Sequence, residues 1–248
     1  MARQARRKSE TGIYHVVLRG IDRKTLFEDG EDYDRFMELL QKYKEVDGYR
    51  LFAYCLMSNH VHLLIKTEKE DIALSMKRIA GSYAYWYNVK YRRSGYLYQD
   101  RYKSEAVEDE EYLLAVLRYI HQNPVAAGLC KSMSDYQYSS YASYASEKSG
   151  LIDIDYVYSI IDRESLIMFN DEQPAGSFMD IDTGSKRIDD TEAMEIIRRV
   201  SNCDDPAGFR ALAREQRDDN IKKLKDSGLS IRQISRLTGV SFGAVRKA

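Results

Sequence analysis

The amino-acid sequence predicts an α+β fold followed by a separate, smaller helical tail. Short segments rich in β-branched and aromatic residues alternate with longer segments whose apolar residues recur every three or four positions, which predicts alternating strands and helices. The chain has 248 residues, enough for a full hydrophobic core and a second unit. Near the C-terminus, short helical patterns are separated by single glycines, as in a compact helical module.

Four segments have the composition of strands. Thr11–Arg19 and Tyr49–Met57 are rich in β-branched and aromatic residues. The short turn signal Ser58-Asn59 separates the second of them from His60–Lys66, so these two strands are expected to form a hairpin. Lys103–Val107 is a shorter candidate for the fourth strand.

Three segments within the same region predict helices. Glu31–Asp47 is followed by a glycine suited to end it, residues 70–93 form a long helical pattern, and Glu108–Gln122 begins with acidic residues that favour a helix N-terminus. Asn123-Pro124 is expected to end the last helix. The order β-α-β-β-α-β and a final helix matches the split β-α-β, ferredoxin-like pattern, with one antiparallel sheet and helices on one face.

The remaining sequence predicts less regular structure and then the tail. Residues 132–150 are interpreted as an extended peripheral segment, 155–161 as a short helix, 173–186 as a linker and Thr191–Val200 as a helix. In the tail, helices are expected over residues 220–226, over residues 231–237 and from Ser241 onward. Gly228 and Gly239 lie in the turns between them, and this spacing is similar to that of a helix-turn-helix. The predicted domains are 1–150, an acidic region over 151–217 and the tail over 218–248.

The composition excludes several classes of protein. With 44% hydrophobic and 31% charged residues the chain is not intrinsically disordered, and no apolar run has the length of a membrane helix. The basic N-terminus lacks the apolar segment of a secretory signal. Three scattered cysteines argue against a disulfide scaffold and favour the reducing cytoplasm.

The net charge of −1 conceals an uneven distribution of charge. Residues 1–150 contain 23 Lys/Arg and 21 Asp/Glu, residues 151–217 contain 8 and 15, and residues 218–248 contain 7 and 3. An acidic middle therefore masks a basic tail, and the near-zero total does not exclude a nucleic-acid partner.

His60-Val61-His62 is the strongest local motif. Alternate residues of a strand point to the same face, so both imidazoles would project together and could supply half of a metal site. The alternative is a pair of surface histidines on an edge strand.

A second motif surrounds Tyr119. On a helix Tyr119 and Asn123 are four residues apart and share a face, where the phenol could act as a nucleophile and the amide oxygen as a ligand for a hard metal ion. The alternative is a core tyrosine with an asparagine that ends the helix.

Basic and aromatic residues are interleaved between residues 83 and 103. Aromatic faces stack on unpaired bases while Lys and Arg bind phosphates, so this pattern favours single-stranded DNA. Tyr83 and Trp86 are interpreted as core residues, whereas Arg92, Arg93, Arg101 and Lys103 are more difficult to explain as core.

These motifs together resemble a known family. CLMSNHVHLLI around His60 and His62 resembles the HUH motif of single-strand DNA transposases, and RYIHQNPVAAGL resembles the segment that carries their catalytic tyrosine. YHVVLRGIDRKTLF and GYLYQDRYKS are also similar to that family. The resemblance covers about residues 11–145 and is greatest to the REP-associated tyrosine transposases of the insertion-sequence two-hundred-like class.

The resemblance implies a fold, an activity and the residues that perform it. The family fold is ferredoxin-like, and His60 and His62 would bind Mg²⁺ or Mn²⁺ with Asn123, or otherwise Gln122, as the third ligand. Tyr119 would attack single-stranded, hairpin-associated DNA to give a 5′-phosphotyrosine link and a free 3′-OH. The DNA contacts expected are Arg19, Arg23, Asn59, Arg92, Arg93, Arg101 and Lys103.

Other functions stay open from the sequence. The same scaffold could serve a DNA-binding regulator without chemistry, or a metal-dependent hydrolase that uses water and keeps Tyr119 as a structural residue. The partners expected are single-stranded or hairpin DNA and no membrane, for a cytoplasmic, nucleoid-associated monomer or homodimer. Whether the tail binds duplex DNA also stays open.

Overall fold

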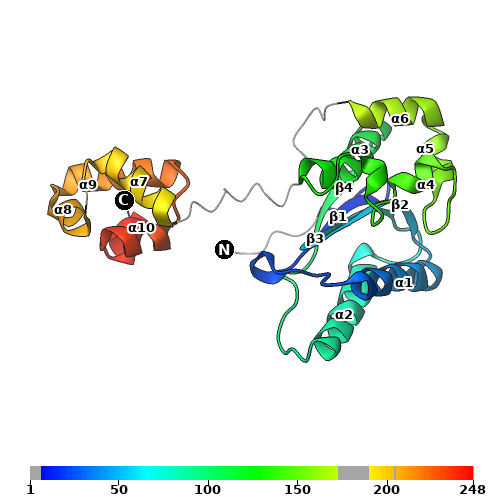
Figure 1. Ribbon diagram of the computed structural model, residues 1–248, viewed down its shortest axis with the longest axis horizontal. Helices are drawn as coiled ribbons and strands as arrows, with labels where there is room; N and C mark the ends of the chain where they lie inside the picture. The colour runs from blue at the N-terminus through cyan, green and yellow to red at the C-terminus, as the bar shows by residue number, and fades with distance from the viewer. Residues whose placement is uncertain (1–6, 173–189, 204, 248) are drawn as a thin grey trace. The chain divides into compact units, whose positions relative to one another are not determined.

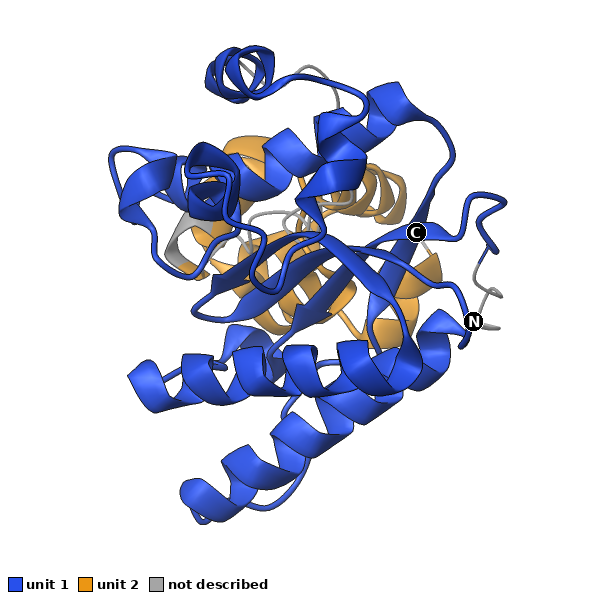
Figure 2. Cartoon of the chain, turned by 90° about the vertical axis from the view of Figure 1, so that its right-hand side faces the viewer, with its two compact units in different colours: residues 1–179 blue, residues 180–248 orange. Residues whose placement is uncertain are grey.

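A computed structural model describes residues 7–172, 190–203 and 205–247. The chain divides into two compact units, residues 1–179 and 180–248, coloured separately in Figure 2. This division does not coincide with the domain boundaries that the sequence suggests at residues 150 and 217. The linker expected over residues 173–186 lies outside the described residues.

Unit 1 is built on a four-stranded sheet in the order β2-β3-β1-β4 (Figure 1). The strands are β1 (Ile13–Arg19), β2 (Arg50–Met57), β3 (His60–Lys66) and β4 (Lys103–Val107). Each neighbouring pair is antiparallel, and β3 lies between β2 and β1. The order and directions confirm the split β-α-β, ferredoxin-like pattern predicted from the sequence.

The two crossover helices pack against one another and end at clear local signals. In α1 (Gly30–Asp47) the N-cap Asp29 forms a capping box with Asp32, and Gly48 ends the helix in the left-handed conformation with φ 70°. In α2 (Ile72–Lys90) the Asp71 carboxylate accepts from the Ala73 N–H. Both helices are as predicted to within a few residues at each end.

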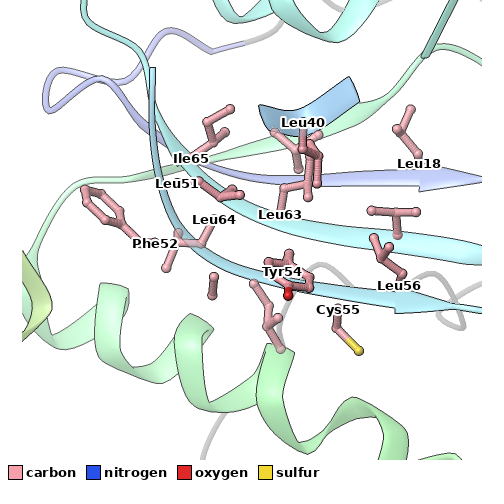
Figure 3. Close-up of a cluster of buried hydrophobic side chains, with 14 of the residues drawn as sticks. Leu18, Leu40, Leu51, Phe52, Tyr54, Cys55, Leu56, Leu63, Leu64 and Ile65 are labelled. Atoms are coloured by element: carbon pink, nitrogen blue, oxygen red, sulfur yellow. The ribbon is translucent and has the colours of Figure 1, made fainter. Parts of the chain in front are cut away.

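Helices cover both faces of the sheet, so the expectation of helices on one face was wrong. Helix α3 (Glu110–Ala126) packs against β2 and β3 on the face opposite α1 and α2 (Figure 1). Figure 3 shows Cys55 on β2 pointing toward α3, while Leu63 on β3 points to the other side. Successive residues of β2 and β3 are buried, which requires cover on both faces.

Helix α3 does not end at Asn123-Pro124, and that expectation was also wrong. The helix includes Pro124 and continues to Ala126, with the Ala127 N–H donating to the carbonyl of Asn123. Proline lacks an N–H and disfavours helical geometry at the residue before it, but here the buried Pro124 packs inside unit 1. Asn123 therefore lies inside the helix rather than at its cap.

Residues 132–172 contain more helix than the sequence pattern predicts. The segment over residues 132–150, which was expected to be extended, includes η2 (Met133–Asp135) and α4 (Tyr141–Ala145). The short helix expected over residues 155–161 is α5 (Ile154–Tyr158). A further helix, α6 (Arg163–Asp171), was not predicted.

The backbone of this region also borders β2. The Leu56 N–H donates to the carbonyl of Tyr138, and the Ser140 N–H donates to the carbonyl of Tyr54. The outer edge of β2 is therefore covered by residues 138–140.

Unit 2 is all-helical and has its own core. Its helices are α7 (Asp190–Ser201), α8 (Pro206–Ala211), α9 (Arg214–Asp226), α10 (Ile231–Thr238) and α11 (Phe242–Lys247). The predicted tail helices correspond to the C-terminal half of α9 and to α10 and α11. No helix in the described part of the chain is long and apolar enough to cross a membrane.

A buried ion pair between α1 and α2 provides a test of this packing. The Asp47 side chain is fully buried and pairs with Arg78, which is 34% exposed. We expect Arg78→Met to lower the free energy of unfolding by about 2 kcal/mol, less than for a fully buried pair because the arginine is partly solvated. Urea denaturation measures this change. The double variant Asp47→Asn/Arg78→Met should recover part of it, and fully additive losses would contradict the pairing.

Candidate active site

Strand register places three histidines on one face of the sheet. His60 lies opposite Arg19, and His62 lies opposite Val17, in the β1–β3 pair. Because alternate residues share a face, His15 on β1 faces the same side as His60 and His62. This is the face covered by α3.

His62 is held by His15. The two imidazoles stack with ring centroids 5.3 Å apart, and His15 Nε2 lies 3.0 Å from His62 Nδ1. Both rings are fully buried. His62 Nε2 is also buried and hydrogen-bonds to none of the described residues.

Burial keeps these two imidazoles neutral. Desolvation lowers the pKa of His15 to about 3. The pKa of His62 lies well below its usual value, first because of burial and then because of the neighbouring His60 and His15. A neutral imidazole is the form that coordinates a metal ion.

The His60 ring is oriented by the side chain of its neighbour Asn59. The Asn59 amide oxygen lies 2.6 Å from His60 Nδ1 and accepts its proton, while His60 Nε2 lies 3.4 Å from the amide oxygen of Asn123. With the proton on Nδ1, two hydrogen-bond acceptors, each with a lone pair, face each other across this second gap. Two acceptors at that separation suit a shared cation.

Helix α3 brings Tyr119 to the same place. Tyr119 and Asn123 are separated by one helical turn, and Asn123 reaches His60. The Tyr119 ring packs edge-on against His62 and His15, with centroid distances of 5.5 and 5.9 Å. His15, His60, His62, Tyr119 and Asn123 are called the imidazole–tyrosine cluster below.

Gln122 and His121 point away from the cluster. Gln122 Nε2 donates to the carbonyls of Asn170 and Glu172 at the end of α6. His121 contacts the Asn170 and Ser140 side chains, and burial lowers its pKa to about 4. Of the two residues considered as a third ligand, only Asn123 contacts the cluster.

Some of the predicted DNA-contacting residues lie beside the cluster. Arg19 is paired with His60 across the strands. Lys103, on the edge strand β4, is paired with Val17, which is itself paired with His62, so Lys103 faces the same side about 10 Å from His62. The Arg23 carbonyl accepts from Asn59 at 3.5 Å.

The other predicted contacts lie elsewhere on unit 1. Arg92 and Arg93 follow the end of α2, where Arg93 lies 5.4 Å from the Tyr87 ring centroid. Arg101 is exposed and borders a cavity of about 860 Å³ between α2 and residues 95–102. Tyr83 is fully buried and Trp86 packs on the core, as predicted.

His15 is the residue of the cluster that the sequence reasoning missed. The two-residue spacing of His60 and His62 predicts that they share a face of the sheet. His15 becomes their neighbour only through the pairing of β1 with β3. The signal available was its two-residue alternation with Val17 and Arg19 on a predicted strand.

None of the five residues of the cluster has an acidic or thiol side chain. Within the described residues, no three His, Cys, Asp or Glu side chains are grouped as a metal site. The possible donors at this position are therefore two imidazoles and one amide oxygen.

Comparison with known proteins confirms the resemblance. Residues 8–123 match the model of the family described as "Transposase IS200 like". This segment contains all five residues of the imidazole–tyrosine cluster.

Individual relatives agree with the family match. A candidate REP-associated tyrosine transposase of Haemophilus influenzae is 28% identical over 123 residues, which cover 44% of this chain and 69% of that protein. The structure of a REP-associated tyrosine transposase bound to a REP hairpin is similar with a TM-score of 0.53 at 16% identity. The match covers 73% of this chain and 100% of the other, and shows a shared fold.

The different environments of Gln122 and Asn123 can be tested directly. We expect Gln122→Ala to remove two hydrogen bonds to α6 and to speed amide hydrogen exchange over residues 163–172, with a stability loss of about 1 kcal/mol. Asn123→Ala is the matched control and should leave exchange in that segment unchanged. The reverse result would contradict the assignment of the two side chains.

Proposed function

We propose that this protein is a metal-dependent transposase that cleaves and rejoins single-stranded, hairpin-associated DNA through a 5′-phosphotyrosine intermediate. The observation that carries the proposal is that one chain brings His60, His62, Tyr119 and Asn123 together. A DNA-binding regulator would have no need for a tyrosine beside two convergent imidazoles. The family match over residues 8–123 supports the same activity.

The cluster fits a divalent metal ion. His62 Nε2 is a buried nitrogen without a hydrogen-bond partner among the described residues, and His60 Nε2 faces the Asn123 oxygen. Amide oxygen is a ligand that suits Mg²⁺ or Mn²⁺, and neutral imidazole is the commonest metal ligand in proteins. His60, His62 and Asn123 would hold the ion, which supplies polarisation of a phosphate oxygen when bound.

Tyr119, whose ring packs against His62, would act as the nucleophile. Its oxygen would form a bond to the phosphorus of a DNA phosphodiester, and the bond from phosphorus to the 3′ oxygen would break. The phenol loses its proton and the departing 3′ oxygen takes one up, leaving a free 3′-OH. Attack by a 3′-OH on the phosphotyrosine reverses this step and rejoins a strand.

Basic side chains beside the cluster would position the DNA. Arg19 next to His60, and Lys103 on the same face, are placed to bind phosphates that flank the cleaved bond. Asn59 orients His60 by accepting its Nδ1 proton. Arg23, Arg92, Arg93 and Arg101 are proposed as more distant contacts to the backbone of a hairpin. The hairpin bound in the similar structure supports this class of ligand.

A covalent adduct tests the proposed chemistry. We expect the wild-type chain to form a protein–DNA adduct with single-stranded hairpin DNA and Mn²⁺, visible as a slower band on a denaturing gel. Tyr119→Phe should form none, because the attacking oxygen is missing, and EDTA should abolish the adduct of the wild type.

Tyr112→Phe on the same helix is the matched control and should keep the adduct. An adduct with Tyr119→Phe would show that another residue attacks. Cleavage that proceeds with no adduct would instead favour a hydrolase, and binding without either would favour a regulator.

His15 provides a second test, because it holds His62 without reaching the proposed ion. For His62 to coordinate through Nε2, its Nδ1–H must donate to His15 Nε2. We expect His15→Leu to weaken Mn²⁺ binding by about 10- to 100-fold in isothermal titration calorimetry, the range found when such supporting groups are removed. His15→Gln, whose amide oxygen can accept the same proton, should recover part of the loss. Equal weakening in both variants, with unchanged thermal unfolding, would count against this role.

A further inference from the structure

In unit 2, α10 and α11 have the arrangement of a helix-turn-helix. Helix α10 ends at Gly239 in the left-handed conformation with φ 69°, and α11 begins three residues later. The left-handed conformation favours glycine at position 239, although a Cβ there would make only ordinary contact with the Arg210 side chain at 3.4 Å. The two helices pack directly on one another.

The turn between the helices is fixed by hydrogen bonds. The Ser235 hydroxyl donates to the Val240 carbonyl at 2.7 Å, and the Ser241 hydroxyl accepts from the Ala244 N–H at 3.3 Å. Val240 and Val245 are buried in a core that also includes Phe209. The angle between α10 and α11 is thus set within unit 2 and needs no contact with unit 1.

The outer face of α11 is exposed and basic. Phe242 is 48% exposed, and Arg246 and Lys247 are exposed and form no ion pair with a described residue. Arg232 on α10 is exposed as well, whereas Arg236 is paired with Asp190. The surface formed by Phe242, Arg246 and Lys247 is called the α11 surface.

The sequences of α10 and α11 carry only positive charge, although Asp190 of α7 pairs with Arg236 on α10. The sequence contains no Asp or Glu between residues 227 and 248, although it contains four Lys or Arg there. The acidic side chains of unit 2 that lie closest in sequence are on α9, where Asp219 pairs with Lys223. A phosphate backbone is complementary to such a surface.

We propose that unit 2 binds double-stranded DNA through the α11 surface, in addition to the DNA site proposed for unit 1. An α-helix fits the B-DNA major groove, and the helix-turn-helix presents its second helix there. Binding of single strands relies on stacked aromatics, but residues 180–248 contain only two aromatic side chains, and one of them, Phe209, is buried. Duplex DNA is therefore the favoured partner.

The test uses the full-length chain and a blunt 30-base-pair duplex of mixed sequence, with binding followed by fluorescence anisotropy between 50 and 200 mM salt. We expect Arg246→Ala/Lys247→Ala to weaken binding roughly 10-fold or more and to reduce the slope of log affinity against log salt by about 2, one for each lost phosphate contact. Arg214→Ala/Lys222→Ala on α9 is the control with the same change in charge, and should have a smaller effect.

A second variant probes the same surface without removing a side chain. A Cβ on Gly243 would meet no atom within 4 Å, so Gly243→Glu can be accommodated and adds a carboxylate to the α11 surface. It should also weaken duplex binding. Unchanged affinity in both α11 variants, or equal losses in the α9 control, would overturn the proposal. Adduct formation on hairpin DNA should be unchanged in all of them, which separates this site from the function of unit 1.

Discussion

The antiparallel pairing of β1 with β3 is the constraint on which the candidate site depends. This register places His60 beside Arg19 and brings His15 within hydrogen-bond distance of His62. A slip of one residue would turn the β3 histidines to the opposite face, against α1 and α2, where neither Tyr119 nor Asn123 could reach them. The buried side chains on both faces of β2 and β3 oppose such a slip, because every buried position would be exchanged for one of different shape.

The fold was largely predictable from the sequence because its strands and crossover helices have strong local patterns. The bounds of β3 and β4 agree with the sequence prediction, and α1 and α2 differ from it by at most a few residues. The prediction was wrong where tertiary packing overrides a local rule. Pro124 lies inside α3 and is buried there, although the local rule for proline predicts that the helix ends before it.

Helix α6 was missed for a related reason. Its sequence contains Ser165 and Asn170, which are poor helix formers, and the helix depends on contacts with α3 such as that of Arg118 with the ring of Phe169. The cluster was predictable in the parts that rest on local spacing: two residues on a strand for His60 and His62, and four on a helix for Tyr119 and Asn123. His15 could not be found in this way, since its partner is 47 residues away.

The two buried imidazoles of the cluster, His15 and His62, are neutral. Burial depresses the pKa of His15 and His62, so the site presents uncharged nitrogen donors although basic side chains stand nearby. The cationic residues Arg19 and Lys103 lie on the same face but toward the edge of the sheet and its turns. In the proposed function, this arrangement would separate metal binding, which needs neutral ligands, from phosphate binding, which needs fixed positive charge.

The cover over β2 has a consequence for self-association. Each of the two edge strands of a sheet has an outer row of backbone N–H and C=O groups. Where such a row is unpaired, it can pair with another chain, as in aggregation and domain swapping. Here the outer row on β2 is paired with residues 138–140, and the opposite edge is the five-residue strand β4, which carries Lys103 and Glu105. Short, charged edges disfavour further strand addition, so the fold protects an otherwise apolar sheet from strand-by-strand polymerisation.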